Sequence, residues 1–206
     1  MHLDTTQLMA LAAALGWASG LRLYAVVFLT GLAGWLGWVQ LPAGLQVLQS
    51  PVLLAVSGAL VLVEFLADKI PWVDSAWDTV HTAIRIPAGA ALAYGVFGGD
   101  EATWGAVAAL LGGSLAATAH AAKAATRAAV NTSPEPFSNI GLSLLGDAFV
   151  PSMLWLSVNQ PLWFFALLAV GVVVMVAAIV LLSRFLRGLL GRLRAAAAGT
   201  SGTAVP

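Results

Sequence analysis

The 206-residue sequence contains no cysteine and few charged residues. Without cysteine the chain can form no disulfide, no Cys-ligated zinc or iron–sulfur site and no thiol nucleophile. Charged residues make up 9% of the chain, whereas soluble domains contain roughly 25%. Nine Lys and Arg residues balance nine Asp and Glu residues. The composition therefore disfavours a water-soluble domain, and the balanced charge predicts no nucleic-acid partner.

Signatures of common enzymes and of secretion are also missing. The sequence has no Walker A loop, no G-x-S-x-G elbow and no HExxH pair. Its first residues, Met1-His2-Leu3-Asp4, lack the basic region of a signal peptide. We therefore predict no catalytic residues and no cofactor, and we favour a non-enzymatic function.

Apolar residues dominate the composition and make up 60% of the chain. A membrane-spanning helix needs about 20 of them in succession. By that measure we predict an all-α, polytopic integral membrane helical bundle of about six embedded segments. Some helices should be broken, since Ser19-Gly20, Pro87 and Pro151 interrupt three segments. The predicted segments are residues 8–38, 52–67, 72–97, 102–131, 139–158 and 162–182.

The segments predict one transmembrane domain, residues 1–194, followed by a disordered C-terminal tail, residues 195–206. They divide three plus three around Gly98-Gly99, giving halves 5–98 and 101–190. An odd number of segments per half would make the halves inverted repeats, as in many transporters. The two halves share little sequence similarity, so the 3+3 repeat rests on the segment count alone.

Basic residues predict the orientation in the membrane. Arg184, Arg187, Arg192 and Arg194 follow the last segment and should lie in the cytoplasm. Six crossings would place the N-terminus there too. Tryptophans flank the opposite turns, as an interfacial aromatic belt would require, at Trp35, Trp38, Trp104 and Trp163. With an Ala/Gly/Leu-rich composition, this predicts a multi-pass protein of the bacterial inner membrane with both termini cytoplasmic.

Polar side chains recur at helical spacing within four of these segments. Ionisable groups inside a membrane helix are costly and by default mark a functional interior. Each set shares one helix face because its members are three or four residues apart. Arg22 follows the Ser19-Gly20 break near mid-membrane. The candidate substrate or ion pathway therefore comprises Arg22, Glu64, Asp68, Asp74, Asp78, His81, Arg85, His120, Lys123, Arg127, Asn131, Asn139, Ser143 and Asp147.

These sets of polar residues form stripes, each along one face of a helix. Besides a pathway for a substrate or ion, the stripes have two other interpretations. Asp74 or Asp78 should lie within salt-bridge reach of Lys123 or Arg127, because an unpaired charge in a bundle is expensive. Such pairs could also simply lock the helices together. The spacing of Asp74, Asp78 and His81 would suit one metal ion, but two carboxylates and one imidazole are a weakly specific ligand set.

Two stretches contain most of these polar residues. The first is Glu64-Phe65-Leu66-Ala67-Asp68-Lys69-Ile70-Pro71, with Val73-Asp74, Trp77-Asp78-Thr79-Val80-His81-Thr82 and Arg85-Ile86-Pro87. The second begins with His120, runs from Lys123 through Arg127 to residues 131–139, and ends with Ser143 and Asp147. Together they resemble a bacterial integral membrane domain-of-unknown-function family, number 4126. The family pattern has an acidic pair at this last point, where Gly146 precedes Asp147 here. The resemblance implies that the polar stripes define the family, and it implies no activity, substrate or cofactor.

Together these features predict a transporter or channel-like protein with a polar vestibule that opens to the cytoplasm. Its partners would be the lipid bilayer and a small anionic or zwitterionic solute, or protons moving through Asp and His groups. A membrane-embedded enzyme acting on a lipid phosphate is one alternative, and a non-catalytic scaffold or assembly factor is another. A homo-oligomer is compatible with all three.

Overall fold

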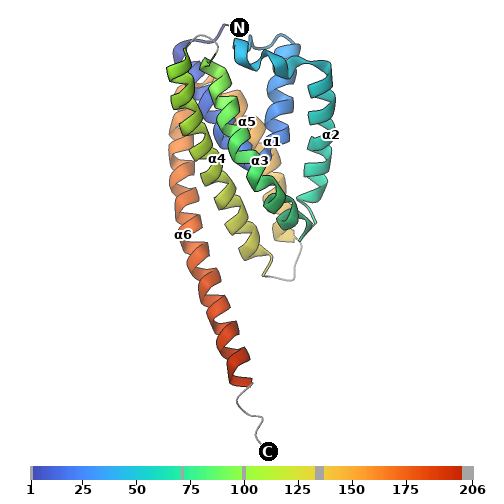
Figure 1. The fold of residues 1–206 in the computed structure, drawn as a ribbon, viewed down its shortest axis with the longest axis vertical. Coiled ribbons are helices and arrows are strands. Elements are labelled where there is room, and N and C mark those ends of the chain that lie inside the picture. Colours follow the sequence, from blue (N-terminus) through green and yellow to red (C-terminus); the bar gives the residue numbers. More distant parts are fainter. Residues whose placement is uncertain (1, 71, 99–100, 133–136, 201–206) are drawn as a thin grey trace, which may run out of the picture.

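The structure is a computed structural model that describes residues 2–70, 72–98, 101–132 and 137–200, the last eight by backbone alone. Pro71 and residues 133–136 of the family motifs lie outside the described residues. Helices account for all regular structure in the described ranges, which confirms the all-α prediction (Figure 1). The elements are α1 (Thr5–Trp35), η1 (Ala43–Gln49), α2 (Pro51–Ala67), α3 (Val73–Phe97), α4 (Ala102–Val130), α5 (Phe137–Asn159) and α6 (Pro161–Thr200).

The chain has the helices of a multi-pass membrane protein. Within the described ranges, four helices are long and apolar enough to cross a membrane, or five if the bent pair η1 and α2 counts as one span. Large apolar side chains of α6, such as Leu162 and Val173, are exposed and suited to contact lipid. α3 falls outside that group because its first half carries charged residues. The six predicted segments are therefore not six uniformly apolar spans.

α1 turns back at Arg22 instead of crossing the bundle. Arg22 has non-helical backbone angles, φ −144° and ψ 72°, close to the predicted break at Ser19-Gly20. The arm before Arg22 runs beside α4, with Gly16 against Gly112 and Gly20 against Ala116. The arm after it runs back along α2, where Phe28 meets Gly58.

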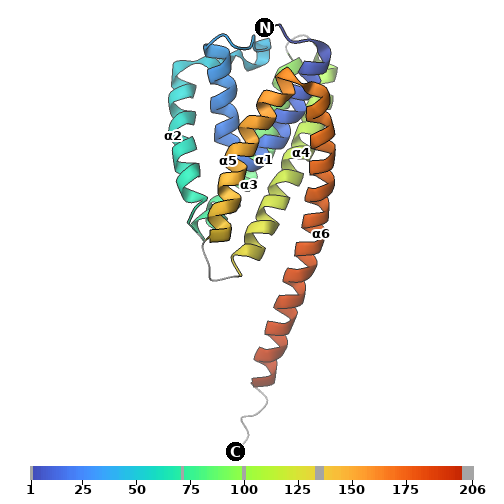
Figure 2. The same cartoon turned by 180° about the vertical axis from the view of Figure 1, so that it is seen from behind.

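This re-entrant path bears on the predicted topology. The start of α1 and η1 lie at one end of the bundle, the upper end in Figure 1, whereas α6 ends beyond the lower end (Figures 1 and 2). Residues 8–38, predicted as one crossing with a break, form a hairpin of two arms here, although α1 is long and apolar enough to span a membrane. The prediction of two cytoplasmic termini depended on a crossing by these residues, and it stays a prediction.

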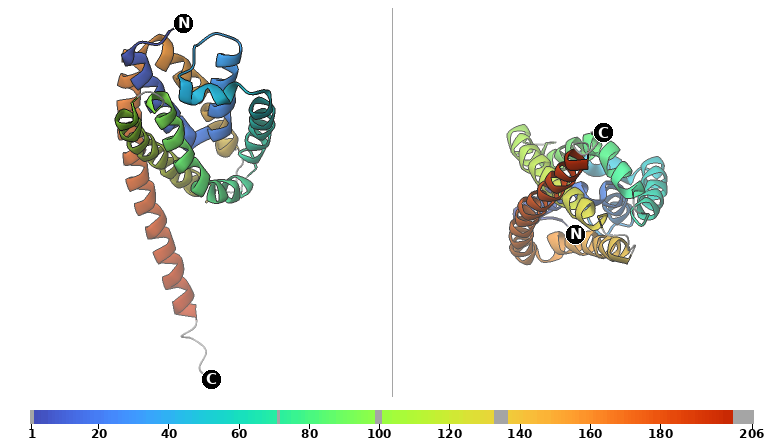
Figure 3. Two further views of the ribbon diagram at one scale, coloured as in Figure 1. Left: turned by 45° about the horizontal axis from the view of Figure 1, so that its top comes forward. Right: turned by 90° about the horizontal axis from the view of Figure 1, so that it is seen from below.

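The 3+3 repeat also lacks support. α4 would be the counterpart of α1, yet α4 is one unbroken helix and α1 is a hairpin. At the C-terminus, α6 continues to Thr200 and extends well past the bundle (Figure 3). Helix thus covers residues 195–200 of the predicted disordered tail, whereas residues 201–206 lie outside the described residues.

Small residues let α1, α3 and α4 pack closely on one another. A Cβ added to Gly16 would lie 2.4 Å from the Cα of Gly112, and one added to Gly112 would lie 2.4 Å from the Cβ of Ala93. Backbones that approach this closely gain packing contacts that larger side chains would prevent. The Gly- and Ala-rich sequence of α4 therefore serves to seat α1 at the centre of the bundle.

Candidate functional site

The break in α1 places the side chain of Arg22 in contact with the end of α2 and with α5. Its Nη1 lies 2.5 Å from Oδ2 of Asp68, at the end of α2, and its Nη2 lies 2.8 Å from Oδ1 of Asp147 on α5. Nη2 also donates to the carbonyl and the hydroxyl of Ser143, at 3.0 Å each. The tip of the hairpin is therefore held by ionic contacts to α2 and α5.

Two further cations connect α2, α3 and α4. Lys123 Nζ lies 3.0 Å from Oδ2 of Asp68 and 2.9 Å from Oδ1 of Asp78. Arg85, fully buried, binds the same oxygen of Asp78 at 2.5 Å and Oε1 of Glu64 at 2.6 Å. Each of Lys123 and Arg85 therefore bridges two carboxylates.

These contacts form one chain of alternating charges, which we call the ion-pair chain. In order its members are Glu64, Arg85, Asp78, Lys123, Asp68, Arg22, Asp147 and Lys69. Its Glu64 end is buried, since the side chains of Arg85 and Glu64 are 0% and 1% exposed. Its other end reaches solvent, where the side chains of Lys69 and Asp147 are 19% and 23% exposed. The predicted contact between Asp78 and Lys123 is confirmed.

A second polar cluster lies next to the ion-pair chain, near the lower end of the bundle. Arg127 Nε is 3.6 Å from Oδ2 of Asp74, the other predicted pairing. Nη1 of Arg127 donates to the carbonyl of Asn139 at 2.8 Å and also to its side-chain oxygen. Asn131 donates to Oδ1 of Asp74 at 3.4 Å. The last turns of α4 are thus tied to the first turns of α3 and α5.

The two histidines of the stripes bind hydroxyl groups. His81 Nε2 is 3.0 Å from the hydroxyl of Tyr24, and its ring stacks on Trp77 with centroids 4.0 Å apart. His120 Nε2 is 2.7 Å from the hydroxyl of Thr82. These contacts orient both rings toward neighbouring helices.

The predicted metal site at Asp74, Asp78 and His81 finds no support among the described residues. Asp74, Asp78 and His81 each bind different partners: Arg127, the Arg85–Lys123 pair, and Tyr24. Across the described residues, no three His, Asp or Glu side chains are grouped as metal ligands.

A cavity of about 240 Å³ adjoins the ion-pair chain between the hairpin tip, α4, α5 and α6. Arg22, Lys123 and Arg127 line it. The other described lining residues carry no charge, and most are apolar: Leu21, Ala122, Thr126, Leu142, Gly146, Val174, Met175 and Ala178. The space therefore combines positively charged groups with a hydrophobic wall, and this combination suits an anion with an apolar part.

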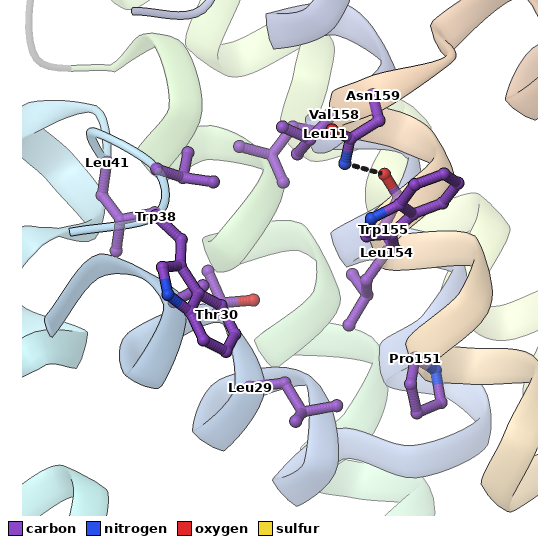
Figure 4. Close-up of a pocket in the computed structure, with 12 residues that line it drawn as sticks. Leu11, Leu29, Thr30, Trp38, Leu41, Pro151, Leu154, Trp155, Val158 and Asn159 are labelled. Atoms are coloured by element: carbon purple, nitrogen blue, oxygen red, sulfur yellow. Dashed lines mark hydrogen bonds between the residues drawn. The ribbon is translucent and has the colours of Figure 1, made fainter. Parts of the chain in front are cut away.

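A second cavity, of about 350 Å³, lies at the upper end, between the two arms of α1 and α5 (Figure 4). Leu11 of the first arm and Thr30 of the second both line it. Asn159 Nδ2, one of its few polar groups, donates to the carbonyl of Trp155 at 2.9 Å (Figure 4). The described residues around it include none of the predicted site residues, so we place the candidate site at the first cavity.

Of the fourteen predicted residues, seven belong to the ion-pair chain and four to the cluster around Arg127, while Ser143 binds Arg22 and the two histidines bind Tyr24 and Thr82. Sequence reasoning missed Lys69 and Tyr24. Lys69 binds Asp147 at 2.9 Å. The sequence did not indicate this contact, because the nearby Pro71 predicted that Lys69 belongs to a cytoplasmic turn. Tyr24 lies two residues after Arg22, and apart from this proximity to the break no sequence pattern marked it as a site residue.

The fold and the site define a multi-pass helical membrane protein with a buried network of ion pairs. Residues 9–183 match a protein family described as "Domain of unknown function (DUF4126)", and the chain belongs to that family. The resemblance drawn from the motifs is therefore confirmed. No curated protein matches the chain, and no solved structure does.

Proposed function

We propose that the protein is a membrane transporter that binds a small anionic or zwitterionic solute beside the tip of α1. The observation that carries this proposal is the broken, re-entrant helix whose Arg22 lies in the ion-pair chain. Interrupted helices inside a membrane are tolerated where they are enclosed by protein or line a cavity, and in many transporters they form the substrate site.

The cavity beside this tip supports an anionic substrate. Its three cations already have partners, Asp68 and Asp147 for Arg22 among them. A buried ion pair contributes little net free energy, because desolvation offsets most of the attraction. An anion that replaced Asp147 at Arg22 could bind without a large penalty, because Asp147 would keep its contact with Lys69. Because Lys69 and Asp147 are partly exposed, we propose that the solute enters from the lower end of the bundle.

A scaffold remains the competing function, and the balance of charge favours it. The described ion-pair chain contains four carboxylates and four cations, and every member has a partner. A network of this kind could specify helix packing alone. The enzyme alternative would have to act without a metal bound by clustered carboxylates and histidines, because the described residues contain no such cluster. Assembly as a homo-oligomer stays a prediction.

For the topology we propose a hairpin, α1, followed by five crossings, α2 to α6. Exposed arginines 184, 187 and 192 on α6 favour the cytoplasm for the lower end. Exposed tryptophans 35, 38, 104 and 163 favour a membrane interface near the upper end. The N-terminus then lies outside the bacterial inner membrane, with the site open toward the cytoplasm.

Cysteine labelling tests this topology, since the chain has no cysteine of its own. In intact spheroplasts, His2→Cys should react with a membrane-impermeant maleimide, and Gly191→Cys should react only after permeabilisation. Protection of both residues in intact cells would restore the six-crossing arrangement with two cytoplasmic termini.

Flux into proteoliposomes tests the transporter. Purified protein should carry at least one solute from a panel of small carboxylates, phosphates and amino acids. Arg22→Gln should lower the initial rate about tenfold or more, because one charged contact to the substrate contributes about 1.5–3 kcal/mol. Arg22→Lys should retain part of the rate, because it keeps the cation without the second donor group.

The matched control is Arg187→Gln, an exposed arginine on the extension of α6. It removes the same charge outside the bundle and should leave the rate unchanged. No flux above that of empty liposomes across the panel, together with normal folding of the reconstituted protein, would favour the scaffold.

A further inference from the structure

The ammonium group of Lys123 sits among four oxygen atoms. Nζ lies 3.2 and 3.0 Å from the two carboxylate oxygens of Asp68, 2.9 Å from Oδ1 of Asp78 and 3.4 Å from the carbonyl of Leu21. Two buried carboxylates and a main-chain carbonyl thus surround one positive charge. Oxygen ligands of this kind also bind alkali-metal cations.

The carbonyl of Leu21 is available because the helix breaks at the next residue. Arg22 has non-helical angles, so Leu21 lies at the C-terminal end of the first arm, where carbonyls lack helical partners and the helix dipole is negative. Carbonyls at the ends of broken helices are the groups that coordinate coupling cations in secondary transporters.

Asp78 has further capacity to bind a cation. Its side chain is 4% exposed, and its Oδ2 is buried without a hydrogen-bond partner among the described residues. Its other oxygen contacts both Arg85 and Lys123. A buried carboxylate oxygen with no donor is unfavourable, and a cation that bound Asp78 through both oxygens would satisfy it.

Lys123 also lines the anion cavity, so its ammonium lies at the boundary between the two sites. If it moved to an anion there, the ion-pair chain would retain four carboxylates and three cations. One monovalent cation would restore neutrality.

We infer that Asp68, Asp78 and the Leu21 carbonyl form a monovalent-cation site, occupied by the Lys123 ammonium here and by a coupling cation when Lys123 binds substrate. The coupling role rests on the proposed function, whereas the site itself can be tested without transport. Sodium is the probe, because it is small and binds carboxylate and carbonyl oxygens.

Lys123→Ala should create an open sodium site. We would measure its melting temperature by tryptophan fluorescence in detergent, in NaCl and in choline chloride at equal ionic strength. Sodium at about 100 times its dissociation constant should raise the melting temperature by about 5–10 °C. The wild type should melt equally in both salts, because its own ammonium fills the site.

Two control variants test whether the sodium-dependent rise in melting temperature comes from the proposed site. Lys69→Ala removes a cation from the solvent-exposed end of the same chain and should show no preference for sodium. Lys123→Ala combined with Asp78→Asn has balanced charge without either ammonium or sodium, so its melting temperature should be equal in both salts. Asp68→Asn can replace Asp78→Asn as the neutralising change.

The outcomes separate the two proposals. Equal melting of folded Lys123→Ala in NaCl and choline chloride would overturn the cation site and show that the vacated carboxylates take a proton. Failure of Lys123→Ala to fold in NaCl, while a neutral double variant folds, would overturn it as well. Sodium-dependent melting without any measurable flux would retain the site and reject the transporter.

Discussion

Replacing Arg85 by Met is expected to destabilise the fold by on the order of 3–5 kcal/mol, the usual cost of removing one partner from a buried ion pair. Arg85 is fully buried and binds Glu64 and Asp78 through separate nitrogens. Methionine fills part of the space but leaves both carboxylates without the guanidinium. Unfolding of the purified variant, followed by tryptophan fluorescence, measures the loss.

The stability lost in Arg85→Met should result from the missing charge of Arg85 and not from the smaller volume of methionine. Adding Glu64→Gln to Arg85→Met removes one of the uncompensated charges and should recover a large part of the lost stability. Arg184→Met, an exposed arginine on α6, should have no measurable effect. Wild-type stability of Arg85→Met would contradict the buried ion-pair chain as described.

The polar site could be predicted from the sequence because it obeys local periodicity. Charges three or four residues apart on one helix share a face, and a low-dielectric bundle requires opposite charges to meet. The Asp78–Lys123 and Asp74–Arg127 contacts follow from those two rules. The rules could not predict which carboxylate pairs with which cation along the ion-pair chain, because Asp68 and Asp78 could each have paired with several cations.

The hairpin was beyond such rules. Residues 8–38 are apolar enough for a long span, and the arm before Arg22 is buried on nearly all sides, so no polar face marked its path. The turn contains no proline, and only the Ser19-Gly20 pair indicated a break. The return of the chain depends on contacts with α2 and α4, which lie far away in the sequence. The side of the membrane predicted for the N-terminus depends on whether α1 counts as a crossing or as a hairpin.

Lys123 shows why a dry ion-pair network and a transport site need not exclude each other. Its ammonium completes the charge balance with Asp68 and Asp78, while the side chain also lines a cavity. If Lys123 exchanges between Asp78 and a bound anion as proposed, the two arrangements must be close in free energy, and buried ion pairs that nearly break even provide this condition.

Gly16→Ala is expected to destabilise the protein, although alanine is normally the better helix residue by about 1 kcal/mol. The new Cβ would lie 2.4 Å from the Cα and 2.8 Å from the carbonyl oxygen of Gly112. Both are backbone atoms, which cannot rotate away as a side chain could. Overpacking costs about 1–3 kcal/mol and occasionally more, and we expect about 3 kcal/mol here because α1 must shift as a unit.

The matched control is Gly171→Ala on α6, where an added Cβ meets no described atom within 4 Å. This change should stabilise the protein slightly, by up to about 1 kcal/mol, since only helix propensity changes. Opposite signs for the two variants in unfolding followed by tryptophan fluorescence are the expected result. A shift of α1 would also pull Arg22 away from Asp68, so Gly16→Ala should lower solute flux while Gly171→Ala leaves it unchanged. Stabilisation by both substitutions would mean that the arm before Arg22 is not packed against α4, and the re-entrant hairpin would have to be abandoned.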